Sequence, residues 1–382
     1  MTRIQRQNGG LQEEKRGGRC QIPGIPWYCK ALSEFDLGNL RISNTQERII
    51  AMINHCVYKD KNCFTSDYMF FKGNLHCHST VSDGKYSHEE LIDRYRNRGY
   101  SFLCFSDHRK FTDYTHLDRQ DFISLPGVEW DSNWGIEHPA WLAKTHHMHG
   151  IRGNREMISQ AEKMPFAHEA DLPQMSYYGR DTVQEMARYM RQRGNFCIYN
   201  HPRFNQTTPE DFGLLEGYTA LEIYNNAAEL LYGTGLTVTY WDNLLNAGCR
   251  ILGVACDDNH NNFECEDSYG GWISVNSENL THENIINAIL EGRYYSSSGP
   301  EIIQYGVRDG SAFVECSSVN HISFIAGGNV GVGKTVWSKI NGDDISYAEY
   351  KLLNKESYIR VECIDKYGKT AWSNPLYPAE RG

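Results

Sequence analysis

Histidine and carboxylate side chains recur in this sequence where short apolar runs end. The candidates for metal ligands are His76, His78, Asp83, His108, Glu129, His147, His201, Asp258 and His260. The i, i+2 spacing within the first and last pairs of this series points both side chains of a pair to one face of an extended segment. Six imidazoles and three carboxylates suit zinc, manganese or iron(II), and they are more than one metal ion can use. A single histidine of this kind could equally be a hydrogen-bonded core or surface residue. That alternative does not explain a whole series of them at successive strand ends.

The apolar runs themselves predict the elements that position these side chains. Between residues 70 and 300, runs such as YSFLCFSDH, NFCIYNHP and RILGVACDDNH alternate with helix patterns such as SHEELIDRYRNRGY. Alternating strands and helices predict βαβ units and a parallel sheet. The polar residues fall at the carboxyl ends of the strands, where a parallel α/β barrel assembles its active site. After residue 300, strand-like runs broken by turn dipeptides predict a small all-β, sandwich-like domain.

Four segments follow from this pattern: a flexible arm over residues 1–25, a helical preamble packing on the barrel over 26–69, the barrel over 70–300 and the β domain over 301–382. One motif in the β domain, GNVGVGKT, fits the P-loop pattern. A phosphate-binding P-loop needs a helix directly after it, and here only about six residues precede an Asn-Gly turn. The motif is therefore predicted to be a Gly-rich hairpin.

Composition narrows the class of partner and the compartment. The 382 residues include 38 Lys and Arg against 48 Asp and Glu, a net charge of −10, which argues against coating of DNA or anionic lipid. No apolar stretch approaches the roughly 20 residues that span a bilayer, and the N-terminus lacks the apolar region of a signal peptide. The 12 cysteines are scattered without a CxxC pair, which favours reduced thiols and a cytoplasmic protein.

In chain order, the motifs HCHSTVSDG, FSDH, GVEW, HHMHG, NHP and DDNH resemble those of the polymerase and histidinol phosphatase (PHP) family. The resemblance covers about residues 70–300, and the following YYSSSGP and β structure are similar to two-domain PHP phosphoesterases. It implies an α/β fold with a distorted (β/α)7 barrel and two or three divalent metal ions. The resemblance does not decide whether these ions are zinc, manganese or iron.

Carried over by motif, the resemblance assigns His76, His78, Glu129 and Asp258 to a first metal. Glu129 would bridge to a second metal held by His147 and His201, and Asp83, His108 and His260 would hold a third. His147 is preferred over its neighbours His146 and His149 because the spacing His-x-x-Gly matches the family's strand. Asp107 and Asp257 are expected to orient imidazoles from outside, with solvation or helix capping as the alternative.

The expected activity is hydrolysis of a phosphate ester, a small phosphomonoester or a nucleotide, by a metal-bound hydroxide at a di- or trinuclear site. Glu129, Asp258 and His201 would hold the metal-bound water. Arg109 and Arg203 directly follow ligand histidines, so either could clamp phosphate, although a surface ion pair is an equal alternative. Long nucleic acid is disfavoured by the charge, and nothing in the sequence fixes the oligomeric state or the choice between mono- and diesterase activity.

Two other functions share part of this pattern. An amidohydrolase-type barrel shares the HxH start but bridges its metals with a modified lysine, and Glu129 takes that position here. A non-catalytic metal- or ligand-binding module, whose β domain binds carbohydrate or a protein partner, would be expected to have lost ligands. This sequence keeps all of them.

Overall fold

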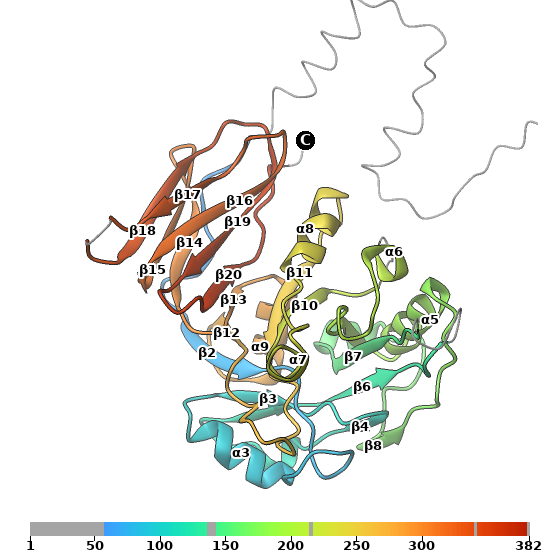
Figure 1. Ribbon diagram of the computed structural model, residues 1–382. Helices are drawn as coiled ribbons and strands as arrows, with labels where there is room; N and C mark the ends of the chain where they lie inside the picture. Colours follow the sequence, from blue (N-terminus) through green and yellow to red (C-terminus); the bar gives the residue numbers. More distant parts are fainter. Residues whose placement is uncertain (1–56, 136–142, 214–216, 340–341, 380–382) are drawn as a thin grey trace, which may run out of the picture. The chain divides into compact units, whose positions relative to one another are not determined.

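The computed structural model describes residues 57–135, 143–213, 217–339 and 342–379, and these form a strand-rich mixture of α and β structure in three sheets (Figure 1). In spatial order, the seven-stranded sheet consists of β11 (Leu252–Cys256), β10 (Ala220–Asn225), β9 (Asn195–Tyr199), β7 (His147–Arg152), β6 (Gly127–Asp131), β4 (Lys110–Thr112) and β8 (Glu169–Asp171). The nine-stranded sheet consists of β17 (Lys334–Trp337), β16 (His321–Gly328), β19 (Glu356–Ile364), β20 (Thr370–Ser373), β13 (Tyr294–Ser297), β12 (Trp272–Ser277), β2 (Met69–Asn74), β3 (Phe102–Cys104) and β5 (Ile123–Leu125). The third sheet has the order β1 (Lys61–Asn62), β14 (Ile302–Arg308), β15 (Ser311–Val319) and β18 (Ile345–Lys351).

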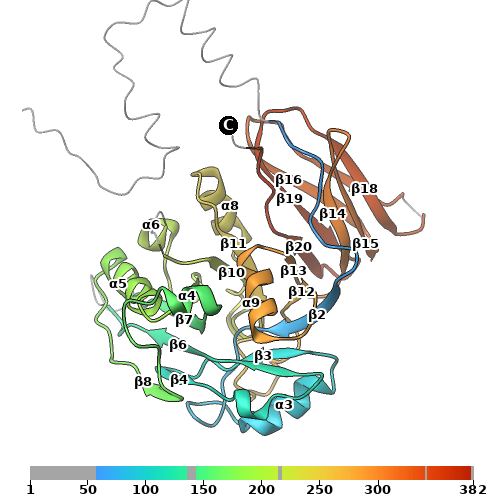
Figure 2. The same cartoon turned by 180° about the vertical axis from the view of Figure 1, so that it is seen from behind.

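The helices are short and connect or cover the strands (Figures 1 and 2). They are α3 (His88–Arg96), α4 (Arg155–Ser159), α5 (Arg180–Arg191), α6 (Pro209–Phe212), α7 (Asn226–Tyr232), α8 (Val238–Asn246), α9 (His282–Leu290) and the 3₁₀ turn η1 (Thr115–Leu117). Helix α3 begins at a capping box in which Ser87 and Glu90 each bond the other's backbone N–H. None of the described helices has the length and apolar character needed to cross a membrane.

The predicted parallel sheet is only partly correct. Strands β2, β3 and β5 pair in parallel, as do β9, β10 and β11, but β7 is antiparallel to both β6 and β9. A parallel return needs a long crossover, usually a helix, and the described residues between β6 and β7 contain none. The sheets are therefore mixed.

Apolar side chains from both large sheets share one core. Phe102 on β3, Ile198 on β9, Val254 on β11 and Ile273 on β12 are fully buried in it, and α9 contributes Ile285. Strands of both sheets thus bury their apolar faces against each other, which fixes the strand ends that carry the polar residues. Cys104 and Cys256, two members of this core, are free thiols.

Residues after 300 form the predicted antiparallel β structure, but their sheets do not stop at that position. Strand β20 pairs with β13, so the nine-stranded sheet continues from one part into the other. At the other end, β1 pairs with β14. The described part of the predicted helical preamble, residues 57–69, thus contributes a strand and no helix, while the rest of it and the predicted arm lie outside the described residues. The boundaries drawn from the sequence remain predictions.

The P-loop-like segment is a hairpin, as predicted. Gly328 ends β16, and Lys334 and Thr335 begin β17, which pairs antiparallel with β16. A strand therefore stands where a phosphate-binding helix would be required.

Candidate metal centre

All nine predicted ligands lie together in the structure. Their ligand atoms form three overlapping groups, within each of which all atoms lie within 4.8 Å of one another: His78, Asp83, His108 and His260; His76, Glu129, His201 and Asp258; and His108, Glu129 and His147. These groups do not divide the ligands among individual metals, because His78 Nε2 also lies 3.0 Å from Asp258 Oδ1, and His147 and His201 both lie 3.1 Å from Glu129 Oε1. The allocation drawn from the motifs therefore remains a prediction. Glu129 is shared between two groups, as the bridging prediction requires.

Two interleaved backbone segments place four of these side chains. The segment after β2 carries His76 and His78, and the segment after β11 carries Asp258 and His260. The Asp258 N–H donates to the His76 carbonyl at 3.0 Å, and the His78 N–H donates to the Asn259 carbonyl at 3.1 Å. Asp258 has a left-handed φ of 57°, an uncommon conformation for a non-glycine residue. The two i, i+2 pairs therefore meet at one edge, where the neighbouring strands end.

His147 reaches the same edge by a different route from the one predicted. It begins β7 and does not close a strand. Because β7 runs antiparallel to β6, His147 lies opposite Asp131, the last residue of β6, and His149 lies opposite Glu129. The reversal of the strand brings its first residue to the edge where the parallel strands end.

The Glu129 carboxylate is the centre of the cluster and is 1% exposed. Its Oε1 lies 3.1 Å from ring nitrogens of both His147 and His201. Its Oε2 lies 3.3, 3.4 and 3.2 Å from ring nitrogens of His76, His78 and His108. Burial alone would raise the pKa of this carboxyl, but the imidazoles of His76 and His147 hold the pKa well below its ordinary value.

The polar atoms at this centre fit a metal. Glu129 Oε2 and His108 Nδ1 are both buried and lie 3.2 Å apart, yet neither has a hydrogen-bond partner. Buried polar atoms without a partner are costly, so their convergence here needs an explanation. Imidazole nitrogens and carboxylate oxygens at such spacing form the donor set of zinc, manganese and iron(II) sites.

The outward nitrogens of two ligand imidazoles are already occupied. His76 Nδ1 donates to Glu222 Oε1 at 2.9 Å, and His201 Nδ1 donates to Asn205 Oδ1 at 3.0 Å. A carboxylate oxygen only accepts, so the Nδ1 proton of His76 leaves the Nε2 lone pair facing the cluster. This is the arrangement by which outer partners fix the tautomer of a metal-binding histidine.

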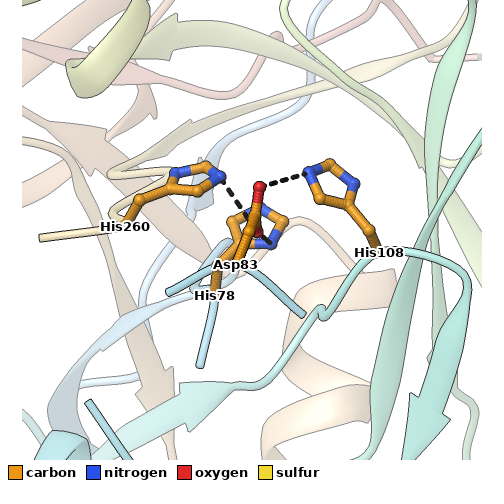
Figure 3. Close-up of side chains that lie close together, drawn as sticks. All are labelled: His78, Asp83, His108 and His260. Carbon is orange, nitrogen blue, oxygen red and sulfur yellow. Dashed lines mark ion pairs between the residues drawn. The ribbon is translucent and has the colours of Figure 1, made fainter. Parts of the chain in front are cut away.

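Figure 3 shows the group of His78, Asp83, His108 and His260, which contains Asp83, the most exposed of the nine predicted ligands. Asp83, 54% exposed, points between the rings of His108 and His260, with its oxygens 3.7 and 3.4 Å from their Nε2 atoms. The same carboxylate lies 3.8 Å from His78 Nδ1. Burial opposes ionisation of Asp83, but His260 and His78 lower its pKa. A metal held here would lie at the solvent side of the centre.

Three supporting residues were missed in the sequence. Fully buried Glu222 lies in β10 and accepts both the His76 imidazole proton and the His201 N–H at 2.8 Å. Asn200 donates to Glu129 Oε1 at 2.7 Å, and Asn225 donates to Asp258 Oδ2 at 3.0 Å. A single carboxylate inside the apolar run ALEIYN was the available signal for Glu222.

Asp107 and Asp257 support loops and bond no ligand imidazole. Asp107 accepts the N–H and hydroxyl of Ser79 and of Ser82, and it lies 3.4 Å from His88, which is not a predicted ligand. Asp257 accepts the Tyr95 hydroxyl at 2.7 Å and three consecutive backbone N–H groups of residues 269–271. Burial raises the pKa of Asp257 to about 7 in spite of these bonds. Both carboxylates act on the backbone next to the ligands.

The two arginines predicted near phosphate have protein partners. Arg109 has a left-handed φ of 54°, and its Nη1 donates to Asp131 Oδ2 at 3.0 Å and to Gln174. Arg203 donates from Nη1 to the carbonyl of Leu236 at 3.0 Å. Both arginines thus bond groups of the protein itself, and Arg109 has the ion pair that was the alternative to a phosphate clamp. A phosphate contact of either arginine remains a prediction.

His147 and His149 can be told apart by their surroundings. His147 belongs to a ligand group, whereas His149 is fully buried, with no partner on either ring nitrogen and its ring centroid 4.1 Å from that of His76.

We expect His147→Leu to lower the metal content of the purified protein and His149→Leu to leave it unchanged, as elemental analysis would measure. The reverse result would assign the ligand to His149.

No family model matches the chain. A 5′-3′ exoribonuclease of Haemophilus influenzae is 30% identical over 141 residues, which cover 32% of this chain and 52% of that protein. The chain thus spans about half the length of the curated relative it matches.

Among solved structures, the chain is similar to a two-domain protein of Bacteroides vulgatus that contains a predicted PHP-like metal-dependent phosphoesterase. The likeness has 10% identity and a TM-score of 0.41, and it covers 84% of this chain and 99% of that one. A Chromobacterium violaceum amidohydrolase is similar at 17% identity and a TM-score of 0.37, over 58% of this chain and 96% of that one. These likenesses leave the activity to be argued from the side chains.

Proposed function

We propose that the chain is a PHP-type metal-dependent phosphoesterase that hydrolyses a small phosphomonoester or a nucleotide at a centre of two or three divalent metal ions. The observation that supports this most is the carboxylate of Glu129, which belongs to two ligand groups and lies within 3.4 Å of ring nitrogens of five imidazoles. A carboxylate between two groups is suited to hold two cations close together. The proposed fold around it is the distorted PHP barrel.

Divalent ions bound there would polarise phosphoryl oxygens and lower the pKa of bound water toward about 7. The chain's own residues prepare this chemistry. Glu222 holds the His76 proton on Nδ1, and Asn200 donates to Glu129 Oε1, so both groups are oriented before a ligand binds. The accessible group with Asp83 lies at the side from which a substrate can enter.

No serine or cysteine nucleophile is assigned. Cys77 and Cys256, which lie within two residues of predicted ligands in the sequence, are poor candidates, because burial raises the pKa of both thiols well above the ordinary value. Both are fully buried. The proposal therefore relies on water as the nucleophile.

Removal of metal is expected to abolish activity. The test is a panel of phosphorylated metabolites, including monoesters and diesters, assayed before and after chelation and after readdition of manganese, zinc or iron(II). We expect one or more esters to be hydrolysed only by metal-loaded protein, with His76→Ala as the inactive control. Metal bound in stoichiometric amount without turnover of any ester would favour the non-catalytic binding module. Hydrolysis that persists in protein shown to be metal-free would contradict the proposal.

A further inference from the structure

Two aromatic side chains lie beside the inner part of the candidate metal centre. The ring of Phe204 packs edge-on against His201, with centroids 5.2 Å apart, and lies 6.4 Å from the ring of His147. The ring of Tyr232 lies 5.4 Å beyond Phe204 at an interplanar angle of 44°. The two rings therefore extend outward from the ligands of Glu129.

The outer ring is exposed although its backbone is held in place. Tyr232 is the last residue of α7 and is 60% exposed, and Gly233 ends the helix with a left-handed φ of 64°. The turn after the helix is held by Arg203, which bonds the carbonyl of Leu236, and by the Asn225 N–H, which bonds the carbonyl of Gly235 at 3.1 Å. An anchored turn thus presents an aromatic ring to solvent beside buried ligands.

Core packing does not explain this placement. Leu230, two residues before Tyr232 in α7, and Leu236, in the turn after the helix, are also 52% and 46% exposed, so this helix end and turn present several apolar side chains to solvent. Exposed apolar side chains that border a polar site are characteristic of ligand-binding surfaces. The ring of Phe204 lies between Tyr232 and the metal centre, where the proposed function places phosphate.

We propose that Phe204 and Tyr232 form a stacking site for the base of a nucleotide whose phosphate is bound at the metal centre. This inference rests on the proposed function and names its substrate class. Aromatic rings stack on the faces of bases and tolerate any base, so the preference would be for a base over none. Metal ions would hold the phosphate and the aromatic rings would hold the base, so a nucleotide can bind without a stripe of basic residues. This agrees with the net charge of −10.

The test is a matched pair of non-hydrolysable phosphonates, one of adenosine and one of ribose alone, which differ only in the base. Their dissociation constants are measured by calorimetry on the metal-loaded full-length protein. The wild type is expected to bind the adenosine compound about tenfold or more tightly than the ribose compound, the size of one base stacked on a protein ring. Tyr232→Ala should remove most of that preference, and Tyr232→Phe should keep it.

Phe263 provides the matched control. It is 41% exposed and lies beside a different ligand group, with its ring 6.0 Å from that of His260. Phe263→Ala is expected to keep the preference for the base. Equal binding of the two phosphonates, an equal loss of both in Tyr232→Ala, or loss of the preference only in Phe263→Ala would each overturn the stacking site. In each of these cases hydrolysis of an abasic ester would leave the proposed function standing, whereas failure to hydrolyse any ester would overturn both.

Discussion

Glu129→Gln is expected to cost the protein at least one metal ion and to lower turnover by about a thousandfold or more. The loss of metal and turnover follows from the surroundings of the two carboxylate oxygens of Glu129. Asn200 donates to Oε1 at 2.7 Å, so an amide nitrogen cannot take that position without two donors facing each other. The amide nitrogen is therefore placed where Oε2 now lies, among His76, His78 and His108. There it carries no charge and offers no lone pair to a metal.

Asp83→Asn is the matched control, because it makes the same chemical change at an exposed ligand that belongs to one group only. It is expected to weaken that group and to leave the metal content of the other two largely intact. Elemental analysis and turnover are measured on both variants, with circular dichroism to show that they are folded. Full metal content and a near-normal rate in Glu129→Gln would show that this carboxylate does not bridge the groups.

The residues of the site could be named from the sequence because their pattern is local. Each ligand sits within a short motif such as HCH or DDNH, and a motif of that kind depends on the end of one strand. The structure brings all nine side chains together. Their division among metals was harder to predict, because it depends on side-chain directions after the strands have packed. His78, for example, belongs to the group of Asp83 and also lies 3.0 Å from Asp258, so its allocation to one metal remains a prediction.

Strand direction was not predictable from alternation alone. The run HHMHGI has the same apolar pattern whether it runs with or against its neighbours, and only pairing shows β7 to be antiparallel. The pairing of strands that lie far apart in the sequence was equally unpredictable. Residues 61–62 give no local signal that they join β14, some 240 residues later in the sequence. Glu222 was missed for a related reason, since its partners His76 and His201 come from two other strands.

Asp242→Ala is expected to destabilise the protein by about 3 kcal/mol, the lower end of the cost of removing one partner from a buried ion pair. Arg360 on β19 is 1% exposed and bonds Asp242 on α8 with two parallel contacts of 2.9 and 2.8 Å. Its remaining Nη1 bonds Glu362 at 2.7 Å, and its guanidinium lies 4.9 Å from the ring of Trp241. Because Glu362 still faces the cation in the variant, the loss should not reach the full cost of an unpaired buried charge.

This ion pair joins a strand after residue 300 to a helix before it, so its loss should be visible as a lower midpoint of urea unfolding followed by tryptophan fluorescence. The control is Asp121→Ala, which removes the exposed partner of Arg96, where side chains are 55% and 40% exposed. Solvent screens such a pair, and the midpoint should hardly move. Combining Arg360→Met with Asp242→Leu removes both charges of this pair and should recover part of the stability, because no buried cation is left to solvate, whereas Glu362 loses its partner. If Asp242→Ala unfolds at the same urea concentration as the wild type, Arg360 is satisfied by Glu362 alone and the contact with α8 contributes no stability.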